Sequence, residues 1–533
     1  MSSAASLTAE QENWRPKFNP WLIAVVVALA AFMEVLDTSI ANVALPYMAG
    51  NLGASNDQST WVLTSYLVSN AIVLPISGWL AGAFGRKRFF TICLFMFTVS
   101  SLLCGIAPSL GLLLFFRVLQ GAGGGGLQPM AQAILADTFP PQQRGLAFAL
   151  YGITAVTAPT IGPTLGGWIT FNYSWRWIFF INLPVGLLTL LLVYRFVEDP
   201  PYLAKIKAAG VKLDYIGIAL LTLGVGALQV LLDKGQEDDW FGSRFITTLA
   251  ITAAVGLIGL VIWEWFQKAP IVDVRLFKSF NFASANLMMF NLGIVLFASL
   301  VLMPLFLQTL MGYTAQVAGL AISAGGLMLL FEMPIMGALT TKLQARYLIA
   351  FGWMCLALAM FYSTKRLDLT IGFNTALWLR VAQVVGMGFL FVPITLVAYI
   401  GIPAEKNNAV AGIVNFMRNM GSSVGTSIVT TLLARRSQFH QEILVGHIRA
   451  GNPRFQNGVA GLAQQLSDSG LDKHKAQLTA IARIYQAVQA QAAASAYIDT
   501  FMVLAVGSAF MFFLSFVLKK NDPGGGGAHI EAG

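Results

Sequence analysis

The chain has 533 residues, of which 56% are hydrophobic and only 11% are charged, and its formal net charge is +9. Soluble domains carry about 25% charged residues, so the composition excludes an ordinary soluble protein. Apolar runs that reach the roughly 20 residues needed to cross a bilayer recur from Trp21 to Leu518. A transmembrane β-barrel would instead show alternating segments of about 10 residues. The sequence therefore predicts an all-α polytopic membrane protein.

Polar breaks divide the chain into fourteen predicted membrane spans. The tail 1–20 is polar and has no signal-peptide pattern, so the first apolar run is expected to remain as a membrane helix. The spans are expected near residues 21–45, 60–84, 89–107, 111–136, 145–170, 177–196, 214–233, 245–267, 283–309, 314–340, 346–363, 375–401, 408–434 and 496–518. An even number of spans places both termini on one side of the membrane.

The distribution of Lys and Arg predicts which side that is. These residues are concentrated in the loops on the side of the termini, as in "GRKR" at 85–88, and are scarce in the short loops on the other side. Because cytoplasmic loops carry the excess of Lys and Arg, we expect both termini in the cytoplasm. Topology accounts for the positive net charge, and no nucleic-acid partner is expected.

An internal repeat divides the chain into two halves. The stretch "RVLQGAGGGGL" (117–127) aligns with "RVAQVVGMGFL" (380–390), and "GWLAGAFGRKRF" (78–89) aligns more weakly with "GALTTKLQARYL" (337–348). The aligned stretches keep the same orientation, which predicts a parallel repeat with substrate at the midplane between the halves. The expected organisation is a cytoplasmic tail (1–20), a six-helix bundle (21–200), an inserted helix pair with its loops (201–270), a second six-helix bundle (271–520) and a cytoplasmic tail (521–533).

Segment 435–495 is the only large piece expected outside the membrane, and it faces outward. No Pro or Gly occurs from Asp472 until Gly507, so the last span is expected to extend outward as one long helix. The stretch "LTAIARIYQAVQAQ" is mildly amphipathic, which suits either packing within this chain or contact with a partner helix.

The glycine-rich stretch after Arg117 formally contains a G-x-G-x-x-G pattern at Gly121, Gly123 and Gly126. A dinucleotide-binding loop would need a strand before it, whereas both flanks here are predicted membrane helix. No G-x-x-x-x-G-K-[ST] motif occurs, so ATP is not expected to drive the protein directly. We interpret the glycines as a surface that lets helices approach closely.

Arg117 and Asp37 are charged residues inside predicted spans, where a charge is costly and is by default functional. At 1.5 Å per residue, Arg117 lies ~9 Å and Asp37 ~13.5 Å from the outer ends of their spans, depths compatible with pairing or with a shared water-filled cavity. Glu34 is three residues before Asp37, on nearly the same helix face. Two close carboxylates disfavour double ionisation, as a proton carrier requires. We therefore predict that these three residues couple transport to protons, the alternative being a permanent Asp37–Arg117 salt bridge that only holds helices together.

Other polar residues in the predicted spans are candidates for substrate binding. Glu332 lies ~15 Å from the inner edge of its span, near the midplane. Each of the others could equally be a helix–helix contact. The remaining candidates are Asn70, Gln128, Gln383, Asn415 and Arg418.

Two stretches are candidates for gating. "GITAVTAPTIGPTLGGWI" (152–169) contains Pro159, Pro163 and glycines that permit a kink and tight packing. "GRKR" could be a topology anchor only, or part of an inner gate. The gating residues expected are Gly78, Gly85, Arg86, Gly162, Pro163, Gly166 and Gly167.

Cysteine and histidine give no sign of a metal or redox site. The three cysteines lie in apolar runs without a C-x-x-C pair, and the four histidines form no H-E-x-x-H motif. No metal and no cofactor are expected.

Five stretches resemble motifs of the fourteen-helix drug:proton antiporters of the major facilitator superfamily, in particular its EmrB-like branch. They are "LDTSIANVALP", "GWLAGAFGRKR", "RVLQGAGGGG", "APTIGPTLGG" and "WRWIFFINLPVG". "LLDKGQEDDWF" and "PIVDVRLFKS", around the inserted pair, are also similar to that branch. The resemblance covers nearly the whole chain. Where the broad family has an Asp-Arg pair in the loop after the second span, this chain has Gly82 and Ala83.

The resemblance implies a major facilitator fold of two six-helix bundles plus two inserted helices, and export of drugs coupled to inward proton flow. Asp37 and Arg117 match the coupling acid and the helix-4 arginine of the family, and its antiporter signature is matched by Gly162, Pro163, Gly166 and Gly167. The resemblance also implies a bacterial inner membrane. EmrB-like relatives work with a periplasmic adaptor and an outer-membrane channel, for which segment 435–495 is the expected docking site.

Three functions compete on these observations. The leading interpretation is a proton-driven exporter of small amphipathic compounds, powered by the proton gradient. A symporter that imports a small organic solute keeps the same fold, but the "GPTLGG" signature argues against it. An embedded enzyme or a sensor has no support from a nucleophile–base set or a soluble signalling domain, so the protein is not expected to be an enzyme.

Overall fold

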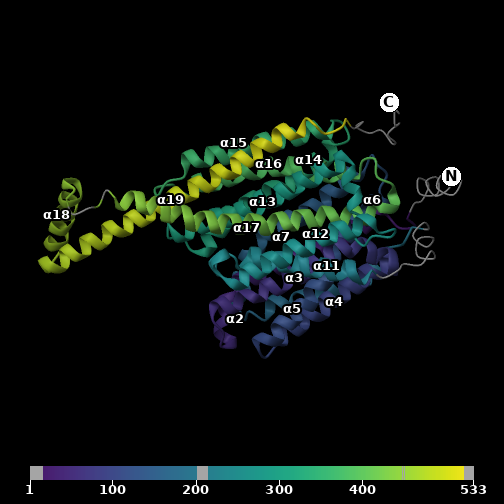
Figure 1. The fold of residues 1–533 in the computed structure, drawn as a ribbon, viewed down its shortest axis with the longest axis horizontal. Helices are drawn as coiled ribbons and strands as arrows, with labels where there is room; N and C mark the ends of the chain where they lie inside the picture. The colour runs from purple at the N-terminus through teal and green to yellow at the C-terminus, as the bar shows by residue number, and fades with distance from the viewer. Residues whose placement is uncertain (1–15, 201–213, 447, 449–450, 521–533) are drawn as a thin grey trace.

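The computed structural model describes residues 16–200, 214–446, 448 and 451–520, and all regular structure within them is helical. Most helices run alongside one another in an elongated bundle, and α18 lies beyond one end of it (Figure 1). This confirms the predicted all-α architecture. Most of the tail 1–20, the start of segment 201–270 and the tail 521–533 lie outside the described residues.

The helices agree with the predicted spans apart from a few of their ends. Span 4 is divided into two helices by a turn at Gly125 and Gly126, and span 6 begins with a separate short helix. Span 13 extends further outward than expected. The bounds are α2 (Pro20–Leu52), α3 (Asn56–Phe84), α4 (Arg86–Ile106), α5 (Leu110–Gly124), α6 (Leu127–Thr138), α7 (Arg144–Asn172), α8 (Trp177–Phe180), α9 (Asn182–Phe196), α11 (Tyr215–Lys234), α12 (Arg244–Phe266), α13 (Phe280–Thr309), α14 (Ala315–Leu339), α15 (Ala345–Arg366), α16 (Phe373–Tyr399), α17 (Asn407–Val445), α18 (Pro453–Asp468) and α19 (Lys473–Ser515).

Membrane-spanning capacity follows from length and hydropathy. Among the described residues, thirteen helical segments are long and apolar enough to cross a bilayer. The one predicted span missing from these thirteen is span 13, which is α17; this helix is long enough but carries polar side chains along its length, including Asn408, Asn415 and Arg418. These polar residues are buried within the protein, which is how a polar helix is accommodated at membrane depth.

The helices pack as two groups and a pair. Helices α2 to α9 contact one another, as do α13 to α17 with α19, while α11 and α12 pack together. The two groups meet where α7 packs on α14 and α3 on α17, and α11 touches both α3 and α17. This is the arrangement that the resemblance implies. We call the face that holds the α3–α4 loop the inner face, following the predicted topology, and the opposite face the outer face.

Glycine allows the close helix contacts that the sequence predicted. A Cβ atom at Gly123 in α5 would lie 2.7 Å from the backbone nitrogen of Phe97 and 2.8 Å from the carbonyl oxygen of Cys93, both in α4. Such distances leave no room for a side chain. The glycine-rich stretch is therefore a packing surface within a helix, and the interpretation as a phosphate-binding loop is excluded by the structure.

The outward segment is a helical hairpin built on the extension of α19. This helix begins at Lys473, where the Asp472 side chain caps it, and continues to Ser515, which confirms the predicted long final helix (Figure 1). Val459 and Leu466 of α18 pack against Ala476 and Ala480 of α19. The amphipathic stretch therefore packs partly within this chain. Another set of apolar side chains on α19 stays exposed, namely Leu478, Ile481 and Tyr485.

The packing role of Gly123 can be tested by adding a side chain there. Gly123→Val is expected to push α5 away from α4 and to lower the free energy of unfolding by about 1–3 kcal/mol, the usual cost of overpacking. The thermal unfolding midpoint of the purified protein measures this. Gly111→Val in the same helix is the matched control, because a Cβ atom at Gly111 meets nothing within 4 Å. Equal midpoints for the two variants would contradict the packing interpretation.

Candidate functional site

Asp37 of α2 and Arg117 of α5 form a buried salt bridge. Arg117 Nη1 lies 2.6 Å from Asp37 Oδ2, and both side chains are buried within the protein. Arg117 Nε also donates to the carbonyl oxygen of Val62 in α3, at 3.1 Å. Of the two arrangements that the helix depths allow, the structure shows the direct pair.

Two further donors hold the Asp37 carboxylate. Its Oδ1 atom accepts hydrogen bonds from Gln120 Nε2 at 2.9 Å and from Asn182 Nδ2 at 2.6 Å. Gln120 Oε1 also accepts from Arg117 Nη1, at 2.8 Å. Asp37, Arg117 and Gln120 are thus each hydrogen-bonded to the other two. Neither Gln120 nor Asn182 was predicted from the sequence to have a role. The signal was present, because Gln120 belongs to the repeated motif and Asn182 to "WRWIFFINLPVG".

Glu34 takes part in a different hydrogen-bond network. Its carboxylate accepts from Tyr66 Oη at 3.1 Å, from Asn70 Nδ2 at 3.0 Å and from Gln128 Nε2. Although Glu34 and Asp37 are one helical turn apart, they share no hydrogen-bond donor among these contacts. The two acids thus lie in separate polar environments, rather than in one shared carboxylate pair.

The Glu34 network continues across the boundary between the two halves. The Oε1 atom of Gln128 in α6 accepts from Arg418 Nη2 of α17. Asn415 Nδ2, also on α17, donates to Gln132 Oε1 at 2.7 Å. The Tyr151 hydroxyl lies 3.1 Å from Gln128 Oε1 and 3.2 Å from Asn415 Oδ1. Four of the predicted substrate-binding residues, Asn70, Gln128, Asn415 and Arg418, are therefore brought together around Glu34.

Tyr66 connects the two acid environments. The Arg117 guanidinium carbon lies 4.3 Å from the centre of the Tyr66 ring, and the hydroxyl of the same side chain donates to Glu34. A cation close to an aromatic ring is stabilised by the ring quadrupole. A shift of Arg117 therefore acts on a residue that also binds Glu34. Sequence reasoning missed Tyr66 because a tyrosine in an apolar helix carries no distinctive signal.

The second half repeats the arginine but not the acid. Arg380 Nη1 donates to Ser299 Oγ of α13 at 2.8 Å, in the way that Arg117 contacts Asp37 of α2. Among the described residues, no carboxylate forms a salt bridge with the buried Arg380. Gln383 donates to Ser363 of α15 at 3.0 Å, so its amide points into its own bundle.

Glu332 lies inside the second half, apart from the network around Glu34. It is buried in α14 against Gly388 of α16, where a Cβ atom would collide with the carboxyl group. Neither carboxyl oxygen has a hydrogen-bond partner among the described residues. The structure therefore groups neither Glu332 nor Gln383 with the other predicted substrate-binding residues.

Arg86, from the "GRKR" stretch, ties the two halves together at the inner face. Its Nη1 atom lies 2.6 Å from Asp137 Oδ2 of α6, and its Nε donates to Asn408 Oδ1 of α17 at 2.8 Å. Asn407 Nδ2 donates to Asp137 Oδ1 at 2.7 Å. We call this set the inner latch: Arg86, Asp137, Asn407 and Asn408. The acid of this latch, Asp137, lies at the inner end of α6. It does not come from the end of α3, where this chain has Gly82 and Ala83.

The predicted gating glycines lie beside this latch and along α7. A Cβ atom at Gly78 would lie 2.8 Å from the backbone of Ala409 in α17, and Gly85 ends α3 with a φ of +89° that glycine readily adopts. Gly166 leaves a Cβ position only 3.0 Å from the carbonyl oxygen of Ile40 in α2. A Cβ atom at Gly162 would collide with Ser39, whereas Gly167 has more space, 3.8 Å from Val43. Glycine thus lets α3 approach α17 and α7 approach α2.

Pro163 removes one hydrogen bond from the middle of α7, because proline has no amide hydrogen to donate to the carbonyl of Pro159. The hydroxyl of Ser39 on α2 donates to that carbonyl oxygen at 3.1 Å. Such replacement by a neighbouring helix is how proline is tolerated in membrane helices. The α2–α7 contact therefore depends on a side chain from the helix that carries both acids.

The architecture and these buried polar networks are those of a polytopic α-helical membrane protein built from two six-helix halves around a polar midplane. The family model described as Major Facilitator Superfamily matches residues 27–426. The chain belongs to the major facilitator superfamily.

Several characterised proteins are similar to it over most of their length. The multidrug export protein EmrB of Haemophilus influenzae is 41% identical over 86% of this chain and 89% of its own length. EmrB of Escherichia coli K12 is 36% identical over 95% of this chain and 98% of its own length. The fatty acid resistance protein FarB of Neisseria gonorrhoeae is 40% identical over 83% of this chain and 86% of its own length. These relatives confirm the resemblance to the EmrB-like branch.

Solved structures support the fold. The proton:xylose symporter XylE superposes with a TM-score of 0.60 at 14% sequence identity, covering 94% of this chain and 96% of that one. The human organic anion transporter MFSD10 gives a TM-score of 0.55 at 14% identity, covering 94% of this chain and 100% of that one. At this identity the likeness shows the fold alone.

The inner latch can be tested by removing its acid. Asp137→Ala leaves the buried Arg86 without its carboxylate, a change that commonly costs about 3–5 kcal/mol, so the inner ends of the two halves are expected to separate more readily. Labelling of a cysteine introduced in the inner part of α3 should accelerate. Asp273→Ala is the matched control, because its pair with Lys406 is more exposed and such pairs are worth about 0–1 kcal/mol. Equal labelling rates in the two variants would contradict a latch.

Proposed function

We propose that this protein is a proton-coupled multidrug efflux transporter that exports small hydrophobic or amphipathic compounds by alternating access. The proton gradient is the energy source, and no cofactor and no enzymatic step are required. The observation that carries the proposal is the buried network in which Glu34, close to the Asp37–Arg117 pair, is linked through Gln128 to Arg418 of the other half. The names of the relatives as multidrug export proteins support the direction of transport.

Asp37 and Arg117 are proposed to carry the coupling, together with Glu34. When Asp37 takes up a proton, its charge-assisted bond to Arg117 weakens, because the buried cation loses its counter-ion. The guanidinium then lies beside the Tyr66 ring without a carboxylate, and its altered position reaches Glu34 through the Tyr66 hydroxyl. Glu34 in turn contacts Gln128, so a change at Asp37 reaches the boundary between the halves.

The energy of one proton is sufficient for substantial accumulation against a gradient. Moving one charge through ~100 mV releases ~2.3 kcal/mol, whereas a tenfold gradient of substrate requires ~1.4 kcal/mol. A single coupling carboxylate would therefore be enough.

Substrate is proposed to bind at the midplane boundary. Asn70, Gln128, Asn415 and Arg418 offer amide and guanidinium groups there, on helices of both halves. The chain has 19 Met and 38 Phe residues, which supply adaptable apolar surface for compounds of different shape. For Glu332 and Gln383, which lie inside the second half, a contact with substrate stays a prediction.

The proposed setting is a bacterial inner membrane with both termini in the cytoplasm. The outward hairpin of α18 and α19 would then project into the periplasm, where we propose that a periplasmic adaptor of the EmrA kind docks and connects the pump to an outer-membrane channel of the TolC kind. The exposed apolar side chains Leu478, Ile481 and Tyr485 of α19 suit contact with a helix of such an adaptor. Import of a solute is not favoured, because the relatives over most of the chain are named as export or resistance proteins.

The coupling role of Asp37 is tested by Asp37→Asn. The amide keeps the shape of the side chain but carries no charge and takes up no proton, so efflux driven by an imposed pH gradient in proteoliposomes is expected to be abolished. Glu34→Gln is expected to lower efflux as well, through the Gln128 contact. Normal proton-driven efflux in Asp37→Asn would refute the proposed coupling.

Loss of folding must be separated from loss of coupling. Arg117 loses its counter-ion in Asp37→Asn, so the variant is expected to be less stable by as much as about 3–5 kcal/mol. Efflux is therefore compared at equal amounts of folded, reconstituted protein. Asp57→Asn is the matched control, because Asp57 is an exposed acid in the first turn of α3 and should leave efflux unchanged.

A further inference from the structure

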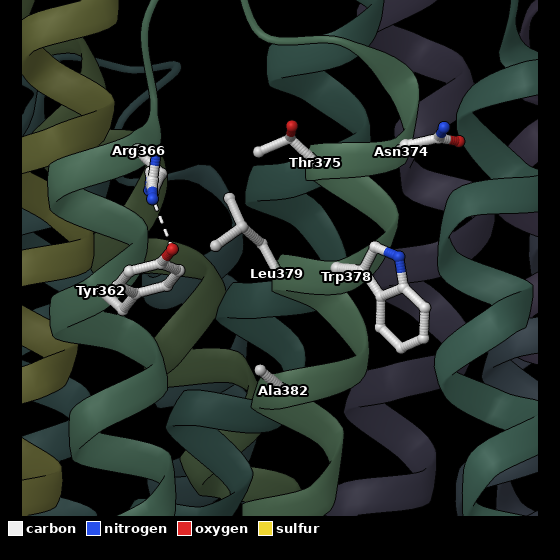
Figure 2. Close-up of a pocket in the computed structure, with 7 residues that line it drawn as sticks. All are labelled: Tyr362, Arg366, Asn374, Thr375, Trp378, Leu379 and Ala382. Atoms are coloured by element: carbon white, nitrogen blue, oxygen red, sulfur yellow. Dashed lines mark hydrogen bonds between the residues drawn. The ribbon is translucent and has the colours of Figure 1, made fainter.

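A groove lies at the outer end of α15 and α16, remote from the acids that are proposed to couple transport. Its volume is about 350 Å³, and its walls are Tyr362, Arg366, Asn374, Thr375, Trp378, Leu379 and Ala382. Figure 2 shows Tyr362 and Arg366 on one helix facing Thr375, Leu379 and Ala382 on the other. None of these residues belongs to the networks of Asp37, Glu34 or the inner latch.

The groove is polar at one end and apolar at the other. Arg366, Asn374 and Thr375 lie toward the α15–α16 loop, while Trp378 and Ala382 follow along α16 toward the membrane interior (Figure 2). At 1.5 Å per residue, Ala382 is about 12 Å further along the helix than Asn374. The shape thus matches an amphiphile with a polar head and an alkyl chain.

The guanidinium of Arg366 is available for an anion. Its Nε donates to the Tyr362 hydroxyl at 2.8 Å, which fixes the side chain and leaves both Nη groups to bind a ligand. Among the described residues, no carboxylate forms a salt bridge with Arg366. Asp368 is nearby in sequence, but its Oδ1 accepts from the amide and the hydroxyl of Thr370, at 2.7 Å and 2.6 Å. These bonds hold the pKa of Asp368 below its usual value, so its charge is satisfied locally.

The groove is continuous with a lipid-facing surface. Exposed apolar side chains recur along α15 at helical spacing, at Tyr347, Phe351, Met354, Leu358 and Phe361. Such a stripe on a membrane helix faces the bilayer. Trp378, two-thirds exposed, lies in the second turn of α16, and tryptophan is enriched near the ends of membrane helices, where it meets the membrane interface. A ligand therefore reaches the groove from the bilayer.

We propose that this groove is a binding site for an anionic phospholipid of the outer leaflet, with the lipid phosphate on Arg366 and an acyl chain along Trp378, Leu379 and Ala382. The planar guanidinium donates two parallel hydrogen bonds to a phosphate, which the more compact ammonium of lysine does not. Thr375, which points toward Arg366 in Figure 2, supplies a further polar group at the head. The assignment to the outer leaflet rests on the proposed function's orientation, in which both termini are cytoplasmic. The lipid site itself does not depend on that orientation.

Native mass spectrometry of the purified, full-length protein tests the proposal. The protein is titrated with phosphatidylglycerol and, separately, with the zwitterionic phosphatidylethanolamine. The parent protein should prefer phosphatidylglycerol, and Arg366→Ala should weaken its binding about fivefold, the factor that corresponds to ~1 kcal/mol for one basic residue near a membrane surface. Trp378→Ala should weaken binding of both lipids, because it removes the wall for the acyl chain.

Lys365→Ala is the matched control. Lys365 is exposed, carries the same charge and is adjacent to Arg366, but it lies over the Phe361 ring and does not line the groove. An equal loss of phosphatidylglycerol binding in both variants would overturn the site in favour of general surface charge. Absence of a preference for phosphatidylglycerol in the parent protein would overturn it as well.

A third arm separates lipid from free amphiphiles, since a fatty-acid anion shares the oxyanion head and alkyl chain. Laurate is titrated in place of lipid. Binding of laurate that depends on Arg366, without binding of phosphatidylglycerol, would overturn the lipid assignment. Thermal unfolding verifies that each variant is folded. Because the readout is lipid binding, a negative result leaves the proposed export function untouched. Normal proton-driven efflux in Asp37→Asn, which would refute the proposed coupling, likewise leaves the lipid site untouched.

Discussion

The constraint on which the first half depends is the burial of the Arg117 guanidinium within the membrane. A buried cation is tolerated only when a carboxylate and further hydrogen-bonding groups replace the water that it loses. Asp37 supplies the charge, and Gln120 and the carbonyl of Val62 supply further contacts. These groups come from α2, α3 and α5, so the position of one guanidinium determines how three helices pack. The glycines of α5 then allow the close approach that the bonds require.

The two halves have diverged at this position. The repeat places Arg380 in α16 where Arg117 lies in α5, but Ser299 takes the place of the acid. The Ser299 hydroxyl accepts from Arg380 and donates to the carbonyl oxygen of Leu296, but it carries no charge, so no carboxylate stands at the place that corresponds to Asp37. Its contribution to the midplane comes instead from Arg418 and Asn415 on α17. The protein therefore has a repeated scaffold with different chemistry in each half.

Helix positions and the Asp37–Arg117 pair could be predicted because each follows from local sequence, through hydropathy and depth along a helix. The partners of Glu34 could not be predicted, since they depend on the rotation of α3, α6 and α17 about their axes. Gln383 illustrates the same difficulty, because its place in the repeat gave its depth but not that it faces Ser363 of α15. Arg86 was a predicted gating residue, but its partners in the inner latch were missed, because Asp137 and Asn408 are distant in sequence and become neighbours only when the halves pack.

Polar contacts join the two halves at two depths, the inner latch and the network around Gln128. Both contacts involve α17, and both place a buried arginine between the halves, Arg86 at the inner face and Arg418 at the midplane. When the inner ends of the halves separate, Arg86 loses its contact with Asn408, and Arg418 loses its contact with Gln128. Water that enters from the inner face can hydrogen-bond to Arg86 first, in place of Asn408. Arg418 lies deeper, so its release depends on Gln128 and hence on Glu34. In the proposed mechanism, protonation of the carboxylates weakens the deeper of these two contacts, because Arg418 is held by Gln128, which also binds Glu34.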